Sequence, residues 1–163
     1  MRHIHIVGRR NHGKTALIAD LLGEFGRRGI RAGSIKHSAH DHELDVPGKD
    51  SYRHREAGAN PAAIIARNVM AVFVSRSSGD DCYLRLEPLF ADCELVLVEG
   101  DIEAGGINVE VWRQAVGTPC LATERGDIAA VVTDDQPAVA IPVWPRNDAA
   151  RLADLVLGLA RPS

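Results

Sequence analysis

The sequence predicts an α/β fold in three layers, with a mainly parallel sheet flanked by helices. Short β-rich apolar runs alternate along the chain with segments whose apolar residues recur at helical spacing. This alternation favours a parallel sheet joined by right-handed crossovers. A glycine-rich motif, GRRNHGKT (8–15), falls between the first predicted strand and the first predicted helix. That context is typical of the P-loop nucleoside triphosphatases.

The elements of the first third are predicted from local patterns. The run HIHIV (3–7) predicts a strand that ends at Gly8. A helix is expected over 14–28, because apolar side chains recur at helical spacing before Gly29 ends it. The next expected elements are a strand over 31–35, a polar loop over 37–49 and a short helix over 50–57.

The rest of the chain continues the alternation. The run ELVLVEG (94–100) is continuously apolar until its end, as in a strand buried on both faces. The final helix is expected to begin at a cap formed by Asn147 or Asp148. The other expected elements are strands over 62–66, 71–75, 108–112, 128–134 and 139–143, and a helix over 83–91.

Composition narrows the possible classes of protein. One domain over 1–163 is the simplest prediction, since no repeat, linker or low-complexity tract interrupts the chain. A net charge of −3 argues against sequence-independent nucleic-acid binding, and no polybasic or long apolar run suggests a membrane. Three cysteines without a C-x-x-C pair predict reduced thiols, and the first residues do not resemble a signal peptide. We therefore expect a soluble, cytoplasmic protein.

The motif GRRNHGKT matches the full phosphate-loop pattern G-x-x-x-x-G-K-[ST]. Gly8 and Gly13 allow the backbone to curl, so that its N–H groups form a nest for an anion. Lys14 is expected to reach the β- and γ-phosphates, and Thr15 to offer its hydroxyl to Mg²⁺. The alternative is a glycine-rich turn that binds nothing. The predicted ligand-binding loop comprises Gly8, Arg9, Arg10, Asn11, His12, Gly13, Lys14, Thr15 and Ala16.

Other charged residues are expected to converge on this loop. P-loop proteins need an acid at the end of a neighbouring buried strand, and Glu99 occupies that place in ELVLVEG. Ligands gather at the carboxyl ends of parallel strands, so Lys36 and His37 should lie beside the phosphates. Asp50 is predicted as a second acid at the metal. The predicted metal ligands are thus Thr15, Asp50 and Glu99, and the predicted catalytic residues are Lys14, Asp50 and Glu99.

The segment IKHSAHDHELDVPGKDSYRHREAGA (35–59) resembles the family of molybdopterin-guanine dinucleotide biosynthesis protein B, MobB. Members of that family carry K-H-x-x-H, then D-x-P-G-K-D-S-x-R, then A-G-A. They also share a P-loop near the start, a strand ending in Val-Glu-Gly and a later strand ending in arginine. In this chain LVEG (97–100) and VEVWR (109–113) correspond to those strands. The resemblance covers roughly the whole chain.

This resemblance implies a GTP-binding protein with Mg²⁺ as cofactor, weak GTPase activity and a role in molybdenum-cofactor guanylylation. It implies a MobA-type guanylyltransferase as partner and a homodimer as assembly, and it leaves open whether molybdopterin binds directly. Carried over by position, the P-loop, Asp50 and Glu99 form the nucleotide and Mg²⁺ site. The positions that match the family without an assigned role are Lys36, His37, His40 and Arg113.

The chain departs from the family in places. Asp101 and Ile102 follow Gly100, where the family often has an aromatic residue and a lysine. The chain has no Asn-Lys-x-Asp motif, the common guanine-reading sequence of small GTPases. Asp134 is a candidate for accepting hydrogen bonds from the guanine edge, with an ordinary turn as the alternative.

The histidine-rich segment after the second strand allows two interpretations. His37, His40 and His42 lie near Asp41 and Asp45, and imidazoles suit transition metals. Their spacing matches no closed structural metal site, which favours solvated or phosphate-contacting histidines.

Three functions fit the sequence. The first is a slow Mg²⁺-dependent GTPase. The chain has no obvious arginine finger, and the candidates are Arg9, Arg10 or an arginine of a partner. The second is an adaptor that binds GTP and scarcely hydrolyses it. The third is an ATP-dependent small-molecule kinase or synthetase, which base preference would distinguish.

Overall fold

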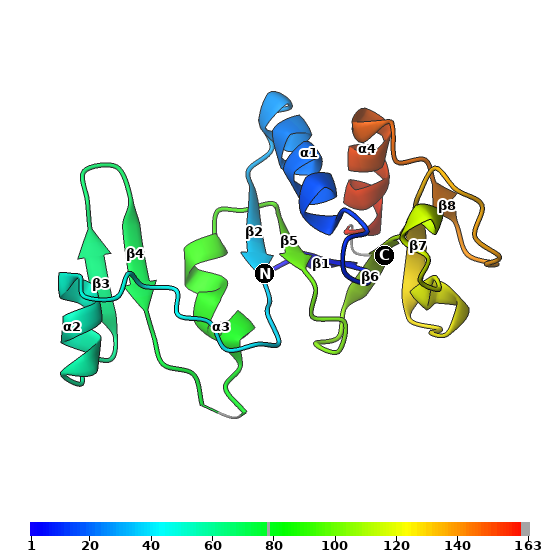
Figure 1. Ribbon diagram of the computed structural model, residues 1–163. Coiled ribbons are helices and arrows are strands. Elements are labelled where there is room, and N and C mark those ends of the chain that lie inside the picture. Colours follow the sequence, from blue (N-terminus) through cyan, green and yellow to red (C-terminus); the bar gives the residue numbers. More distant parts are fainter. Residues whose placement is uncertain (78, 161–163) are drawn as a thin grey trace. The chain divides into compact units, whose positions relative to one another are not determined.

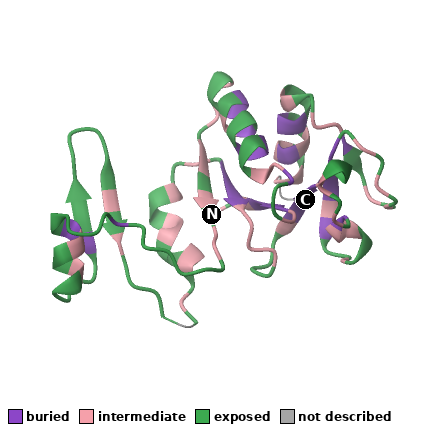
Figure 2. Cartoon of the chain, viewed as in Figure 1, coloured by how far each residue is buried: buried purple, intermediate pink, exposed green. Residues whose placement is uncertain are grey.

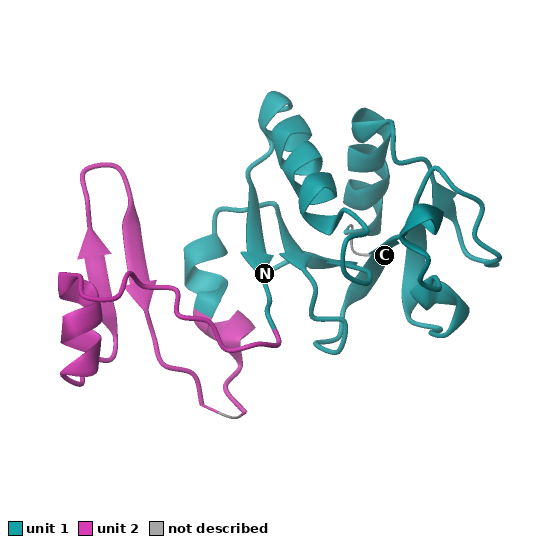
Figure 3. Cartoon of the chain, in the orientation of Figure 1, with its two compact units in different colours: residues 1–38, 86–163 teal, residues 39–85 magenta. Residues whose placement is uncertain are grey.

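The protein is described from a computed structural model, which covers residues 1–77 and 79–160. The chain divides into two compact units, residues 1–38 with 86–163 and residues 39–85 (Figure 3). This division does not decide whether the two units unfold together, so the single domain over 1–163 stays a prediction. In the described part of the chain, no helix has the length and apolar character that a membrane span requires.

The first unit is built on a six-stranded sheet in which every pairing is parallel. The strand order is β2-β5-β1-β6-β7-β8. The loop after β1 is therefore flanked by the loops that follow β5 and β6, and all three open at one edge of the sheet. The strands are β1 (His3–Val7), β2 (Ala32–Lys36), β5 (Leu95–Glu99), β6 (Ile107–Val111), β7 (Ile128–Val132) and β8 (Val143–Trp144).

Two helices cover one face of this sheet (Figure 1). Helix α1 (Lys14–Arg27) joins β1 to β2 and starts after Gly13, whose φ of 96° lies in the left-handed region. Helix α4 (Ala149–Leu159) begins at Asp148, whose side chain accepts a hydrogen bond from the Arg151 N–H, as the sequence predicted. The predicted α/β fold with a mainly parallel sheet flanked by helices is confirmed.

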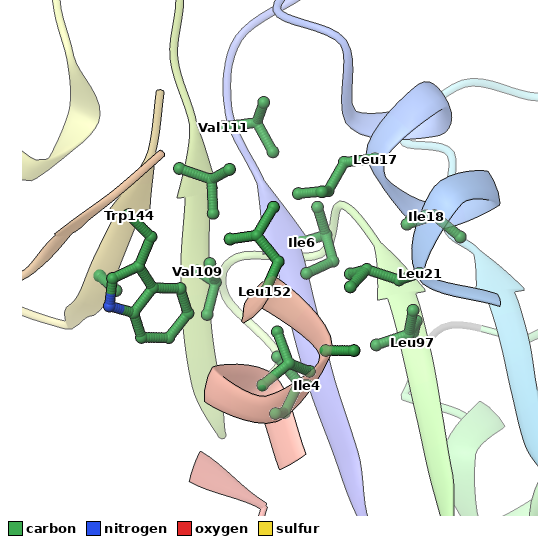
Figure 4. Packing of buried hydrophobic residues seen from close by; sticks show 14 of the residues in the cluster. Ile4, Ile6, Leu17, Ile18, Leu21, Leu97, Val109, Val111, Trp144 and Leu152 are labelled. Carbon is green, nitrogen blue, oxygen red and sulfur yellow. The ribbon is translucent and has the colours of Figure 1, made fainter. Parts of the chain in front are cut away.

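The core lies between these helices and the sheet (Figure 4). Alternate residues of the central strands, such as Ile4 and Ile6 of β1, point toward Leu21 of α1 and Leu152 of α4, and all four are at most 1% exposed. Trp144 of β8 closes the cluster on one side. The core thus fixes β1 against α1, which sets the position of the loop between them.

The opposite face of the sheet buries polar groups beneath short segments. Glu110 of β6 is 1% exposed and accepts hydrogen bonds from the backbone N–H groups of Leu121 and Ala122, at 2.7 and 2.8 Å. At β2 a Cβ on Gly33 would lie 2.5 Å from Phe90, so glycine permits this aromatic ring to pack on the strand. The 3-10 segments Leu121–Thr123 and Glu87–Phe90 supply these covers.

Two of the predicted elements are interrupted by a proline. The helix expected over 83–91 is helix α3 (Cys82–Leu86) followed by the 3-10 turn Glu87–Phe90, because Pro88 has no N–H to continue an α-helix. The strand expected over 139–143 is reduced to β8. Pro142 lacks a ladder donor, and the Val139 N–H bonds to Pro137 O in a local turn.

The second unit contains a short helix, a hairpin and all but the last residue of α3. Helix α2 (Asp50–Glu56) and the antiparallel pair β3 (Ala62–Ile65) and β4 (Met70–Phe73) agree with the predicted elements. Most hairpin residues are exposed (Figure 2). Ala62 is the buried residue at the start of β3. A two-stranded sheet of this kind has little core of its own.

Candidate nucleotide-binding site

Both glycines of the phosphate loop have backbone conformations that a side chain would disturb. Gly8 has a φ of +137°, and a Cβ there would lie 2.5 Å from the carbonyl oxygen of Val111 at the end of β6. Gly13 has a φ of +96°, and its Cβ would lie 2.9 Å from the Arg113 guanidinium. The loop therefore curls closely against the end of β6, as a nest of inward N–H groups requires.

Lys14 is folded back onto the loop. Its Nζ donates to the carbonyl oxygens of Gly8 and Arg9, at 2.8 and 2.9 Å. Burial is the largest cause that lowers the pKa of Lys14, and Glu99 opposes it by favouring the charged form. The ammonium is thus held over the loop, within reach of an anion that the loop would bind.

His12 ties the loop to the segment after β6. The side chain is 1% exposed, its Nδ1 accepts a hydrogen bond from the Arg113 N–H at 2.8 Å, and its Nε2 lies 2.7 Å from Thr118 Oγ1. Because Nδ1 accepts, the proton is on Nε2, which donates to Thr118. Burial is the main cause that lowers the pKa of His12, so the neutral ring is favoured.

Thr15, Glu99 and Lys36 meet at the carboxyl ends of their strands and the start of α1. The Thr15 hydroxyl donates to Glu99 Oε1 at 2.9 Å, and Lys36 Nζ lies 3.4 Å from the same oxygen. The structure thus brings together three residues that the sequence predicted to converge. They line one end of a cavity of about 230 Å³, whose apolar wall comprises Ile18, Ala19, Leu22 and Ile35.

His37 lies next to this group through its backbone. Its N–H donates to the carbonyl oxygen of Glu99 at 3.0 Å, which extends the pairing of β2 with β5 by one residue. Its Nδ1 lies 3.8 Å from the carboxylate of Asp101, the residue at which the chain departs from the MobB pattern. Asp101 has a φ of +57°, an uncommon conformation that follows the turn at Gly100.

The loop arginines differ in their surroundings. Arg9 donates to Glu124 at 2.8 Å and to the carbonyl oxygen of Pro119 at 3.3 Å. Arg10 is exposed, as are Asn11 and Ala16. The ion pair of Arg9 means that a bound phosphate would compete with a carboxylate for this guanidinium.

Asp50 belongs to the second unit, where it is exposed at the first turn of α2. Its predicted position at the metal stays a prediction. His40 and His42 are exposed in the same unit. Across residues 1–77 and 79–160, no group of three or more His, Cys, Asp or Glu side chains is arranged to hold a metal ion.

Asp134 follows β7 and is exposed. Its carboxylate accepts a hydrogen bond from the backbone N–H of Arg146 at 2.8 Å, so one oxygen already holds the loop after β8. A guanine-reading role for Asp134 stays a prediction.

Several partners in the site were not foreseen from the sequence. Thr118 and Glu124, which hold His12 and Arg9, lie 106 and 115 residues from them along the chain. No local motif marks such pairs. The pairing of Asp101 with His37 was also unforeseen. The departure from the MobB pattern at Asp101 was the one signal that the turn after Glu99 differs from that of the family.

The fold and the strand–loop–helix arrangement at residues 3–27 place the chain among proteins of the P-loop nucleoside triphosphatase fold. Within that class the chain belongs to the MobB family, since its residues 3–134 match the family model of molybdopterin guanine dinucleotide synthesis protein B.

Individual relatives agree with this assignment. The molybdopterin-guanine dinucleotide biosynthesis adapter protein of Escherichia coli (strain K12) is 31% identical over 150 residues, which cover 89% of this chain and 85% of the relative. The adapter protein of Haemophilus influenzae is 35% identical over 115 residues, 70% of this chain and 65% of the relative.

Solved structures have the same fold. A crystal structure of molybdopterin-guanine biosynthesis protein B (mobB) aligns with a TM-score of 0.73 at 27% identity and covers 96% of this chain and 99% of that chain. The structure of Bacillus subtilis MobB aligns with the same TM-score at 24% identity over the whole of both chains, a likeness of fold alone.

Proposed function

We propose that this chain binds GTP with Mg²⁺ at its P-loop and acts as an adapter in molybdopterin guanine dinucleotide synthesis, where it assists a MobA-type guanylyltransferase. The observation that carries the proposal is the group formed by Thr15, Glu99 and Lys36 beside the phosphate loop. The similar proteins from E. coli and H. influenzae are named adapter proteins of this biosynthesis, which supports the pathway.

The loop itself supports phosphate binding. The curl between Gly8 and Gly13 precedes helix α1, whose N-terminus adds the positive end of its dipole. On binding, Lys14 exchanges its two carbonyl partners for phosphate oxygens, a stronger charge-assisted interaction. His12 holds the loop in place during this exchange, because its bonds to Arg113 and Thr118 do not involve the nest.

The residues near Thr15 fit Mg²⁺. A hydroxyl and a carboxylate oxygen 2.9 Å apart are hard oxygen ligands, and Mg²⁺ is usually held by one or two such groups with water and substrate phosphates. In this proposal Thr15 and Glu99 hold the ion, with Asp50 as the further acid that the sequence motif assigns. When bound, the ion would neutralise charge that develops on the phosphates. Lys36 would balance the remaining charge of Glu99.

Weak hydrolysis is part of the proposal, and an adapter with negligible hydrolysis is its alternative. Arg9 is paired with Glu124, so it would have to leave that carboxylate to stabilise a transition state. This favours a slow reaction by the isolated chain, with any acceleration supplied by the partner. Turnover measured with and without the guanylyltransferase separates the two alternatives.

The proposed setting is the cytoplasm and the proposed assembly is a homodimer. Cys82, Cys93 and Cys120 are all free, which suits a reducing compartment. The hairpin of β3 and β4 exposes apolar side chains that a second copy would cover. Whether molybdopterin binds directly stays open.

Calorimetric titration with non-hydrolysable analogues of GTP and ATP, each with and without Mg²⁺, tests the proposal. We expect Mg²⁺-dependent binding that prefers the guanine nucleotide. Lys14→Ala should weaken it by about tenfold or more, since a charge-assisted hydrogen bond is lost. Arg151→Ala, on the exposed side of α4, is the matched control for removing a cation. Unchanged affinity in Lys14→Ala would exclude the loop as the site. Equal or better binding of the ATP analogue would favour the kinase or synthetase alternative.

A further inference from the structure

The guanidinium of Arg113 lies against the last glycine of the phosphate loop. A Cβ on Gly13 would lie 2.9 Å from Nη2, 3.1 Å from Cζ and 3.3 Å from Nε of Arg113. These three distances place the plane of the guanidinium beside the residue that directly precedes Lys14. A permanent positive charge therefore borders the nest, in addition to the ammonium of Lys14.

The backbone of Arg113 is fixed to the same loop. Its N–H donates to Nδ1 of the buried His12, and His12 also bonds to Thr118. Trp112 donates from its backbone to Val132 O and from its indole to Thr118 O, at 3.2 and 2.9 Å. The root of the Arg113 side chain is thus held in a set position relative to Gly13, and this pre-organisation lowers the cost of using it in binding.

The charge of Arg113 has no protein counter-ion in the part of the chain that the structure describes. The acids near the loop are engaged elsewhere, with Glu124 on Arg9, Glu99 on Thr15 and Lys36, and Glu110 on the backbone of Leu121 and Ala122. Arg113 is also exposed. An anion could therefore reach the guanidinium without displacing a carboxylate, in contrast to Arg9.

We propose that Arg113 binds the phosphate chain of the nucleotide, with His12 as the residue that positions it. This inference rests on the proposed function and adds an arginine supplied by the chain itself. The planar guanidinium offers paired N–H donors, which match phosphate oxygens better than an ammonium does. Lys14 and Arg113 would then contact the phosphates from two separate parts of the chain, helix α1 and the segment after β6.

The test compares Arg113→Gln, Arg113→Lys and Lys14→Ala in calorimetric titrations with GMP, GDP and a non-hydrolysable GTP analogue. Arg151→Gln is the control, because it removes the same charge from an exposed site on α4. We expect Arg113→Gln to weaken GDP and the triphosphate analogue by about tenfold or more, with little change for GMP. Arg113→Lys should recover part of the affinity, because it keeps the charge and loses the paired geometry.

Thermal unfolding without nucleotide distinguishes the loss of a contact with the ligand from a loss of stability of the protein itself. Arg113→Gln should unfold at the wild-type temperature if the side chain acts on the ligand. Affinities within twofold of wild type would overturn the inference, as would a loss in Arg113→Gln that a fall in apo-protein stability accounts for.

The same titrations separate this inference from the proposed function. If the wild-type protein binds and Lys14→Ala loses binding while Arg113→Gln does not, the inference alone fails. If the wild-type protein binds none of the three nucleotides, the proposed function fails and the inference fails with it.

Discussion

Glu99 carries the charge on which the proposed metal site depends. One oxygen accepts from Thr15 and lies 3.4 Å from Lys36, and the side chain is 14% exposed. Glu99→Gln preserves the shape and an acceptor for Thr15 but removes the charge. We expect nucleotide affinity in EDTA to stay near wild type, while the gain in affinity that Mg²⁺ produces falls by about tenfold. Titration with and without Mg²⁺ measures both, and Glu56→Gln, an exposed acid on α2, is the control. A wild-type Mg²⁺ response in Glu99→Gln would remove Glu99 from the site.

His12 makes the stability of the loop depend on pH. Its pKa in the folded protein lies below the ordinary value of 6.5, chiefly through burial, although Glu110 raises it against the cations of Lys14, Arg113 and Arg9. Above about pH 6.5 the ring is neutral in both the folded and the unfolded protein, so its titration does not lower the free energy of unfolding. Below it the unfolded chain takes up a proton that the folded chain resists, so stability falls as the pH falls.

The corresponding experiment compares wild type with His12→Gln by urea unfolding at about pH 7.5 and about pH 5.5. Wild type should lose more free energy of unfolding on acidification than the variant, because glutamine hydrogen-bonds without titrating. His5, whose pKa burial also lowers, is present in both proteins and cancels in the comparison. Equal losses would show that the folded protein takes up the His12 proton as readily as the unfolded chain, which would contradict the lowered pKa.

Among the elements, the loop before α2 is closed by one buried acid. Asp45 is 6% exposed, and its Oδ1 accepts from the Val46 N–H at 2.8 Å and from the Ser51 hydroxyl at 2.9 Å. Arg55 lies 3.7 Å from the other oxygen. The two ends of the D-V-P-G-K-D-S motif are thus bonded to each other, and the residues between them, including Lys49 and Asp50, are held outward.

Asp45→Ala should therefore loosen this loop. It leaves the Ser51 hydroxyl and the Val46 N–H without their acceptor, at a cost of about 1–3 kcal/mol. Hydrogen exchange of the amides over 46–53 reports the effect, which we expect to be faster exchange in the variant. Asp41→Ala, at an exposed position in the same unit, should leave exchange unchanged. Wild-type exchange in Asp45→Ala would show that the loop does not depend on the hydrogen bonds of Asp45.

The hairpin of β3 and β4 presents the apolar surface that the proposed homodimer would bury. Ile65 and Met70 are opposite each other in the register and are 82% and 59% exposed. Replacing both by serine should shift the assembly toward monomer, with a dimer constant weakened by about tenfold or more. Sedimentation equilibrium measures it. Val143→Ser, 42% exposed on β8, is the control. An unchanged dimer in the double variant, or a monomeric wild type, would count against the hairpin as the contact.

At the scale of the whole molecule, the sequence predicted the features that depend on the spacing of apolar residues and on the glycines that end helices and strands. Parallel order explains why Thr15 and Glu99 could be expected to meet, since strand ends share one edge of the sheet. It could not predict the bond of His12 to Thr118, because 106 residues separate them and neither lies in a recognisable pair motif. The apolar run before Val143 suggested a strand of five residues, yet Pro142 removes the donor that such a strand needs.

The amino-acid composition did not predict that residues 39–85 form a separate compact unit. That segment nevertheless carries the most specific resemblance to the MobB family, including Asp50.

If Asp50 acts through Mg²⁺ as the motif predicts, Asp50→Ala should weaken nucleotide binding by about tenfold with Mg²⁺ and scarcely at all in EDTA. Calorimetry on Asp50→Ala and on the neighbouring Lys49→Ala provides the comparison, since both side chains are exposed at the start of α2. An equal loss in EDTA would mean that Asp50 acts without the metal. No loss in either condition would leave the P-loop, Thr15 and Glu99 as a site complete within the first unit.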